Sequence, residues 1–172
     1  MSEDLTGRQL TAREVLRSTP ARRLLTSSLL FYIGVMLQAA TLGKHIYDIT
    51  GREIDIGILG LAEFLPIAAF VLVTGSVADR FNRRVVATIA LIGELGCAVT
   101  LMLYSLTDPT AVWPFFVVGF LFGTSRAFLS PSIRPMYPMV APEGGLPSLI
   151  AMSSAVWTTA AIVGPAVSGF LY

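Results

Sequence analysis

The sequence predicts an all-α, polytopic membrane helical bundle with five transmembrane helices, and three observations lead to this fold class. Apolar residues make up 54% of the chain and charged residues only 13%, whereas a soluble domain usually carries about 25% charge. The charged residues are concentrated near the N-terminus, and long apolar runs then alternate with short polar turns. This balance excludes a water-soluble enzyme core and a disordered chain, and a net charge of +1 gives no support to nucleic-acid binding.

Residues 1–23 form a basic N-terminal segment that we expect on the cytoplasmic side of the membrane. Its composition fits either a helix over 5–16 at the membrane interface or a partly disordered basic tail. The apolar run that follows is 20 residues long, and further apolar runs come after it. Because the apolar region of a cleaved signal peptide is shorter than this, the first span is expected to be retained.

Five apolar runs are long enough to cross a bilayer, which takes about 20 residues for a hydrocarbon core of about 30 Å. Two runs carry no charged residue, and the other three carry one each: Glu63, Glu94 and Arg126. Backbone amides in lipid must be bonded within their own segment unless a closed barrel forms, and barrel strands would alternate polar and apolar residues. The runs therefore predict helices at about 24–44, 56–78, 85–106, 111–133 and 147–172.

Short polar turns connect the predicted helices, and their positive charges set the orientation. Nine arginines fall on the side of the N-terminus, whereas only Lys44 and Arg52 fall on the other side. Because cytoplasmic loops are enriched in Lys and Arg, we predict a cytoplasmic N-terminus in a multi-pass arrangement. The fourth connection is rich in proline, so the fourth helix is expected to kink or end near Pro131.

The turn after the second predicted helix reads Gly-Ser-Val-Ala-Asp-Arg-Phe-Asn-Arg-Arg over residues 75–84. Gly75 permits the close approach of a neighbouring backbone. Asp79 can accept hydrogen bonds from the free amides that open a helix, and three arginines hold the turn on the cytoplasmic side. By composition alone, an ordinary positively charged loop explains the turn equally well.

The spacing in this turn resembles the signature loop of the major facilitator superfamily of secondary transporters. Five of the six defining positions match, and they are Gly75, Asp79, Arg80, Arg83 and Arg84. The departure is Asn82, where that family usually has glycine. Asparagine tolerates a left-handed backbone better than other non-glycine residues, so we expect the turn to keep its shape. The resemblance implies that these six residues form a conformational-switch loop.

Further stretches are similar to the enterobactin-exporter-like branch of this family, which contains proton-coupled drug and siderophore exporters. They lie at residues 47–51, 57–66, 126–131, 140–143, 150–154 and 164–169. The resemblance extends over about residues 24–172 and implies two six-helix bundles with the substrate held between them. The chain would then be an N-terminal fragment in a bacterial inner membrane, lacking the C-terminal bundle and unable to transport alone. Its partners would be a small-molecule substrate, protons and the lipid bilayer.

The fifth predicted helix carries part of the exporter motif of that family. Gly164, Pro165 and Gly169 match three of its six positions, and the other three hold small residues. Small residues allow close helix approach, and Pro165 bends the helix because it lacks a backbone donor. The resemblance associates this bend with export, while a generic, tightly packed membrane helix is the alternative.

Three ionisable residues lie within the predicted spans, where each costs about 2.5 to 3.5 kcal/mol if it is unpaired. Glu94 and Arg126 are expected at similar depth on consecutive antiparallel helices, so one of two interpretations is a buried ion pair between them. In the alternative, Arg126 faces a transport cavity and Glu63 exchanges protons, with Glu94 as the second candidate. Gln38, the only amide in the first span, fits either a substrate contact or a hydrogen bond to a neighbouring helix.

No phosphate-binding loop, metal-ligand spacing, Ser-His pair or Cys-His pair is present in the sequence, so we expect no enzymatic activity, no metal and no cofactor. The single cysteine, Cys97, excludes a disulfide framework. Two functions remain open: the N-terminal part of a proton-coupled exporter, or a small membrane protein that acts as a structural or oligomeric partner. The apolar end at Tyr172 favours the first.

Overall fold

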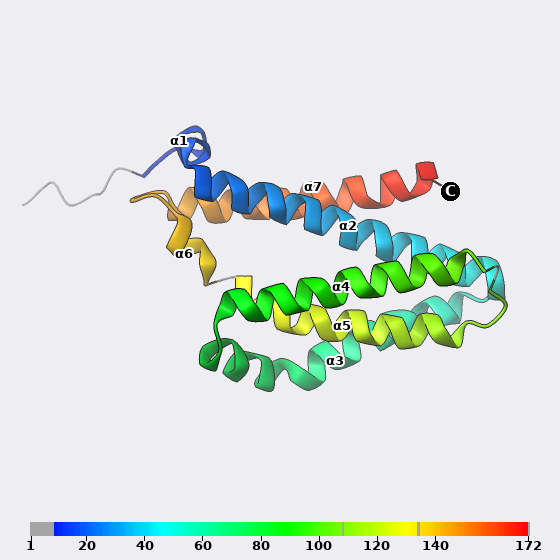
Figure 1. Cartoon of the computed structure of the whole chain (residues 1–172). Helices are drawn as coiled ribbons and strands as arrows, with labels where there is room; N and C mark the ends of the chain where they lie inside the picture. The colour runs from blue at the N-terminus through cyan, green and yellow to red at the C-terminus, as the bar shows by residue number, and fades with distance from the viewer. Residues whose placement is uncertain (1–8, 108, 134, 172) are drawn as a thin grey trace, which may run out of the picture. The chain divides into compact units, whose positions relative to one another are not determined.

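The computed structural model describes residues 9–107, 109–133 and 135–171, although the side chains at 71–73, 75–79, 83, 130–132 and 171 lie outside the described part. Within these ranges the chain forms only helices (Figure 1). In chain order they are α1 (Ala12–Arg17), α2 (Thr19–Thr50), α3 (Glu53–Arg80), α4 (Arg83–Ser105), α5 (Trp113–Ile133), α6 (Met136–Val140) and α7 (Leu146–Leu171). The all-α prediction is therefore confirmed.

Three helices are long and apolar enough to cross a membrane: α2, α4 from Arg84 onward, and α7 as far as Phe170. A shorter apolar stretch lies in α5 at Trp113–Leu129. Two helices, α2 and α3, extend beyond the expected apolar runs at both ends. For example, α2 begins at Thr19 and ends at Thr50, because hydropathy marks only the residues suited to hydrocarbon while helical hydrogen bonding continues into polar residues. The fourth expected helix was to kink or end near Pro131, and α5 ends at Ile133.

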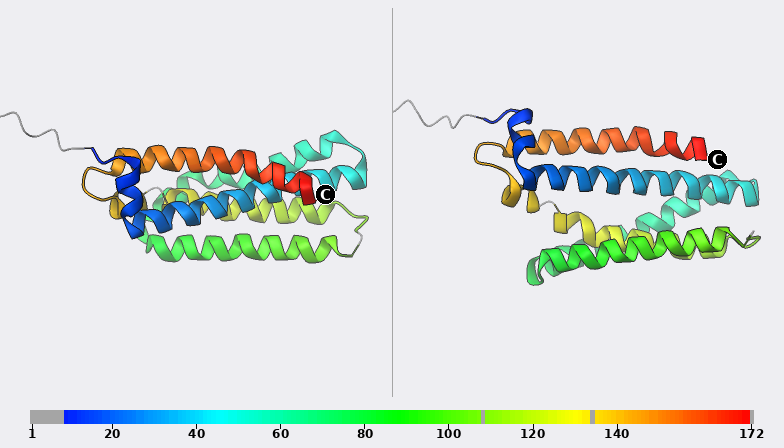
Figure 2. Two further views of the ribbon diagram at one scale, coloured as in Figure 1. Left: turned by 90° about the horizontal axis from the view of Figure 1, so that it is seen from above. Right: turned by 45° about the horizontal axis from the view of Figure 1, so that its top comes forward.

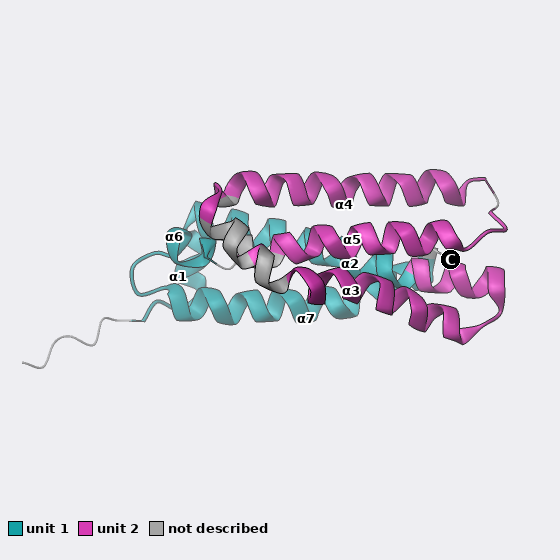
Figure 3. Ribbon diagram, turned by 90° about the horizontal axis from the view of Figure 1, so that it is seen from below, with its two compact units in different colours: residues 1–40, 135–172 teal, residues 41–134 magenta. Residues whose placement is uncertain are grey.

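The chain divides into two compact units (Figure 3). Unit 1 holds residues 1–40 and 135–172, and unit 2 holds residues 41–134. In unit 1, α7 runs beside the first part of α2 and in the same direction (Figure 2). In unit 2, α5 packs along α3 on one side and along α4 on the other, so α5 is the central helix of this unit.

The N-terminal segment packs onto the beginning of α7. Val15 in α1 is fully buried and lies in a core cluster with Ala21, Leu25 and Leu149. The backbone amide of Leu10 donates to the carbonyl of Gly144 at 3.0 Å, and Ser148 Oγ donates to the carbonyl of Leu10 at 2.5 Å. In the described residues the helix predicted over 5–16 is therefore limited to Ala12–Arg17, and of its two large apolar side chains Val15 is buried while Leu16 is exposed.

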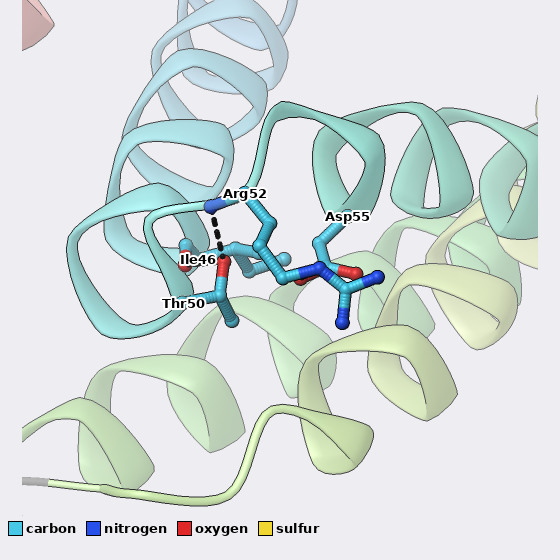
Figure 4. Close-up of polar contacts among 4 residues, drawn as sticks. All are labelled: Ile46, Thr50, Arg52 and Asp55. Carbon is cyan, nitrogen blue, oxygen red and sulfur yellow. Dashed lines mark hydrogen bonds and ion pairs between the residues drawn. The ribbon is translucent and has the colours of Figure 1, made fainter.

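Figure 4 shows the turn between α2 and α3, with the hydrogen bond between Thr50 and Arg52 as a dashed line. A glycine with a left-handed backbone closes this turn. Gly51 has φ = 63° and its amide donates to the carbonyl of Tyr47 at 2.7 Å, a common way to end a helix. Thr50 Oγ1 donates to the carbonyl of Ile46 and accepts from the amide of Arg52. The Arg52 guanidinium then lies 3.9 Å from the Asp55 carboxylate in the first turn of α3.

The turn between α3 and α4 differs from the expected one at Asn82. Its φ is −61° and its ψ is 113°, which is an extended backbone and not the left-handed one expected where the family has glycine. Its side-chain oxygen accepts a hydrogen bond from the amide of Arg84 at 3.0 Å. Asn82 is thus the N-cap of α4, a position that strongly prefers Asn, Asp and Ser.

Candidate functional site

The ionisable residues of the apolar spans gather in unit 2. Arg126 on α5 forms an ion pair with Glu63 on α3, with 3.7 Å between Arg126 Nη1 and Glu63 Oε2. The guanidinium carbon of Arg126 also lies 5.5 Å from the centre of the Phe122 ring, within the range of a cation–π contact. In the ion pair, the Arg126 side chain is 31% exposed and the Glu63 side chain 15% exposed. The pair is thus largely enclosed by protein.

Two glycines on α5 bring α3 close enough for this ion pair. A Cβ added at Gly123 would overlap the carbonyl oxygen of Glu63 and would lie 2.9 Å from the ring of Pro66. A Cβ at Gly119 would lie 2.8 Å from a methyl group of Leu59. Glycines four residues apart are a common means of close helix contact in membranes. Sequence analysis missed this pattern, although the spacing from Gly119 to Gly123 was readable.

Glu94 on α4 is also buried, at 6% exposure, but among the described residues it is not the ion-pair partner of Arg126. Its Oε1 has no hydrogen-bond partner among the residues that the structure describes. The neighbouring Gly93 faces Ser125 of α5, because a Cβ there would come 2.6 Å from Ser125 Oγ. Glu94 is therefore a buried carboxyl group next to a contact between α4 and α5, and its Oε1 is without a hydrogen-bond partner in the described part of the chain.

The ion pair expected between Arg126 and Glu94 is not formed within the described residues, where Arg126 pairs with Glu63. The expectation rested on depths counted from the ends of the apolar runs. Those depths omit the reach of the arginine side chain and the close packing of α3 on α5 at Gly123. Which helix supplies the partner depends on this packing, and a count of residues does not contain it.

The remaining candidates lie in unit 1. Gln38 on α2 has a buried amide nitrogen with no hydrogen-bond partner in the described part of the chain. On α7, Gly164 lies against α2, since a Cβ there would be 2.5 Å from Met36 Cβ and 3.0 Å from the Leu37 amide nitrogen. Gly169 has nothing within 4 Å of such a Cβ, and Pro165 is exposed on the helix.

The small-residue stripe of α7 is therefore divided between two faces. Ala160, Gly164 and Ser168, spaced by four residues, are buried. Gly164, in the middle of this half, is the position at which α7 comes close to α2. The other matched residues of the motif, Pro165 and Gly169, face away from that contact.

The turn that resembles the signature loop is described in part. Arg80, Asn82 and Arg84 are exposed. The side chains of Asp79 and Arg83, and the surroundings of Gly75, lie outside the described residues. The predicted role of these six residues therefore stays a prediction.

Metal ligands and a groove are the remaining features that bear on what the site can bind. No group of three or more His, Cys, Asp or Glu side chains suited to a metal ion occurs among the described residues. An open groove of about 390 Å³ lies between α3 and α5, lined only by apolar residues, which are Ile58, Leu61, Ala62, Leu65, Phe116, Val117, Phe120 and Leu121. The groove contains none of the charged residues and is therefore separate from the ion pair.

The described residues form only helices as regular structure, three of these helices are long and apolar enough to cross a membrane, and a charged pair joins α3 to α5. These features are typical of a multi-pass membrane protein. Comparison with known families makes the assignment specific, because residues 24–172 match the Major Facilitator Superfamily. The chain belongs to this superfamily, whose members are transporters and not enzymes. No solved structure matches the chain.

Curated relatives are named as efflux proteins or transporters. The chain is 27% identical over 130 residues to macrolide efflux protein A of Streptococcus pyogenes, covering 74% of this chain and 32% of the relative. It is 28% identical over 116 residues to macrolide efflux protein A of Enterococcus faecalis, covering 66% and 35%. It is 26% identical over 132 residues to the uncharacterized MFS-type transporter YfiS of Bacillus subtilis, covering 77% and 30%. The matched region thus spans about a third of these relatives' length.

Proposed function

We propose that this chain works as part of the N-terminal bundle of a proton-coupled exporter of small molecules in a bacterial cell membrane. Membership of a transporter superfamily and the efflux relatives support the direction of transport. The observation that carries the proposal of proton coupling is the ion pair between Glu63 and Arg126 inside the apolar spans. Intramembrane ionisable residues are costly and usually mark ion or substrate pathways.

The ion pair links proton binding to helix packing. While Glu63 is ionised, Arg126 is compensated, and α3 and α5 share the pair. Protonation of Glu63 removes the negative partner and leaves the guanidinium uncompensated at low dielectric. The two helices then gain by rearranging so that Arg126 reaches water, a substrate group or another carboxylate. Uptake of one proton and movement of the helices are thereby coupled.

The turn at residues 75–84 is proposed as the conformational-switch loop of this movement. Its support is the spacing of Gly75, Asp79 and the three arginines, together with the family match. Replacing Asp79 by Asn in a transporter that contains this segment should lower turnover more than membrane insertion. Equal losses of turnover and insertion would reduce the turn to a structural element.

The substrate class is proposed from the relatives and from the branch resemblance. Macrolides are the first candidates, because two matched relatives are named macrolide efflux proteins. The enterobactin-exporter-like branch, indicated by stretches such as 126–131, adds catecholate siderophores as the second candidate class. The helix-bend motif at Gly164 and Pro165 supports export in either case.

Everted vesicles test the function directly. Vesicles carrying a transporter that contains these residues are expected to accumulate a labelled macrolide when a proton gradient is imposed. Glu63→Gln should abolish this gradient-driven accumulation, whereas Glu143→Gln, at an exposed position, should leave it unchanged. A labelled catecholate siderophore in parallel vesicles decides between the two substrate classes.

Two outcomes would contradict parts of the proposal. Gradient-driven accumulation that survives Glu63→Gln would remove Glu63 as the coupling residue and leave Glu94 as the candidate. Accumulation by vesicles that carry only the 172-residue chain would overturn the proposal that a C-terminal bundle is required. Absence of transport by any form would favour a structural or oligomeric partner.

A further inference from the structure

Glu94 interrupts an otherwise apolar face of α4. Buried residues recur on this helix at spacings of three and four, which are Ala87, Ala90, Glu94, Cys97 and Leu101. Such spacing places them on one side of the helix, and the packing of α4 on α5 identifies that side as the α5 interface. Within this stripe Glu94 is 6% exposed, and its Oε1 has no hydrogen-bond partner among the described residues.

Few charged or titratable groups face Glu94 from the helices around it. Among the described side chains of α4, the buried stripe that holds Glu94 contains one further titratable group, Cys97, one turn further on. From α5, Arg126 interacts with Glu94 electrostatically, and Glu63 on α3 lies beyond that arginine as its ion-pair partner. Two carboxyl groups therefore share one guanidinium, and one positive charge can compensate only one of them.

The present arrangement assigns the arginine to Glu63. An ionised carboxylate left without a partner in a buried site is strongly unfavourable, and such a group becomes neutral instead. Glu94 is accordingly the carboxyl that must carry a proton while Arg126 is paired with Glu63. No other described group on α3, α4 or α5 at this site supplies a positive charge.

We propose that Glu94 is a second proton-binding site of the coupling machinery, occupied while Arg126 is paired with Glu63, and that Arg126 exchanges between the two carboxylates. When Arg126 moves to Glu94, Glu94 releases its proton and Glu63 takes one up, so the number of bound protons is unchanged. The inference rests on the proposed function, because it extends the coupling site from one carboxyl to two.

The geometry of Arg126 fits such an exchange. Its distance of 3.7 Å from Glu63 is longer than a hydrogen bond between nitrogen and oxygen, so the pair is loose. Its side chain is 31% exposed and is not enclosed on every side. Because α5 packs against both α3 and α4, a rotation of one side chain on the central helix changes the partner without separating the helices.

Infrared spectroscopy of the 172-residue chain in lipid nanodiscs tests the proposal without any transport assay. A protonated carboxyl group has a carbonyl band distinct from that of a carboxylate. At neutral pH we expect one such band in the unmodified chain and its loss in Glu94→Gln. Glu94→Asp keeps an acid and should shift the band, while Glu143→Gln at an exposed position should leave it unchanged.

The exchange of partners has its own test. In Glu63→Gln, Arg126 loses its partner and should pair with Glu94, so the protonated band should also disappear at neutral pH. In the double variant Glu63→Gln with Arg126→Gln, Glu94 again lacks a cation and the band should return. Circular dichroism confirms in each variant that the helices are retained.

Two results would overturn the inference. A protonated band that persists in Glu94→Gln, or no such band in the unmodified chain, would show that Glu94 holds no proton. A band unchanged by Glu63→Gln would show that Arg126 does not exchange. These results differ from those expected if only the proposed function is wrong. In that case the infrared changes would occur as expected, but the vesicles would show no proton-driven transport.

Discussion

Asn82 stands where the family usually has glycine, but it stabilises the turn through its side chain and not through a left-handed backbone. The expected left-handed backbone is absent, since φ is −61°. The residue instead caps α4 through a hydrogen bond from the Arg84 amide to its side-chain oxygen. The two explanations make opposite predictions for substitution by glycine, which is the residue that the family usually carries here.

Asn82→Ala should lower the free energy of unfolding by about 1 kcal/mol, the usual cost of losing an N-cap side chain. Asn82→Asp should be close to neutral, because aspartate caps equally well. Asn82→Gly should be slightly destabilising, by a few tenths of a kcal/mol. Unfolding of the chain in mixed detergent micelles measures all three. A clear gain in stability from Asn82→Gly would instead support a strained left-handed backbone.

The charged residues of the spans could be identified from the sequence, but their partners could not. Glu63, Glu94 and Arg126 stand out because each interrupts an apolar run. Pairing depends on which helices touch and how closely, and this was set by Gly119 and Gly123 on α5. The exposed fractions likewise follow from packing between helices. The contact of Arg126 with the Phe122 ring is different, because the two residues are four positions apart on α5 and their spacing was readable from the sequence.

At the scale of the elements, the contact between α3 and α5 depends on Gly123. Any Cβ at this position would overlap the carbonyl oxygen of Glu63, which belongs to the backbone of α3 and can move only with the helix. Gly96 on α4 has nothing within 4 Å of an added Cβ and is a matched control in a neighbouring helix.

Gly123→Ala should destabilise the chain by about 1–3 kcal/mol, the typical cost of forcing extra volume into a packed interface. Gly96→Ala should be neutral or stabilising by up to about 1 kcal/mol, because alanine favours helix over glycine. Titration with a denaturing detergent, followed by the fluorescence of Trp113 on α5, measures the difference. Equal effects of the two substitutions would contradict the close approach of α3 and α5.

Two glycines of the exporter-like motif on α7, Gly164 and Gly169, lie in different surroundings and can be compared by substitution. Gly164 lies against α2, with Met36 Cβ and the Leu37 amide within 3.0 Å of an added Cβ, whereas Gly169 faces open space. Gly164→Ala should therefore cost about 1–3 kcal/mol of stability, and Gly169→Ala should cost nothing measurable. The fluorescence of Trp157 on α7 follows unfolding of this unit. If Gly169→Ala proved the more damaging change, the motif would have a role outside the contact with α2.

The elements themselves were largely predictable in kind. Long apolar runs identify helices because lipid leaves the backbone no other partner, and the all-α class follows from that alone. Short elements were not predictable. The helix α6 lies at Met136–Val140, inside the stretch read as a proline-rich connection, and α1 owes its place to Val15 packing among residues more than a hundred positions away.

At the scale of the whole chain, membership of the superfamily rests on residues 24–172, while the orientation in the membrane rests on charge alone. Nine arginines on the side of the N-terminus outweigh Lys44 and Arg52 on the other. This bias predicts that Phe81, in the turn between α3 and α4, lies on the cytoplasmic side and that Ile54, at the start of α3, lies on the outer side. Both side chains are exposed, at 64% and 60%.

Cysteine labelling in intact bacteria tests this orientation. With Cys97 replaced by Ala, Ile54→Cys should react with a membrane-impermeant maleimide, and Phe81→Cys should react only after the cells are permeabilised. Both new thiols are close to a helix end and exposed, so a difference in labelling reports the side of the membrane and not burial. The chain with Cys97→Ala alone gives the background.

The result bears on more than topology. Labelling of Phe81→Cys in intact cells would place Arg80 and Arg84 outside the cell, where the positive-inside rule does not put them. The turn could not then be the cytoplasmic switch loop of a transporter bundle. Protection of this thiol, with ready labelling of Ile54→Cys, would support the cytoplasmic position that the proposed switch loop requires.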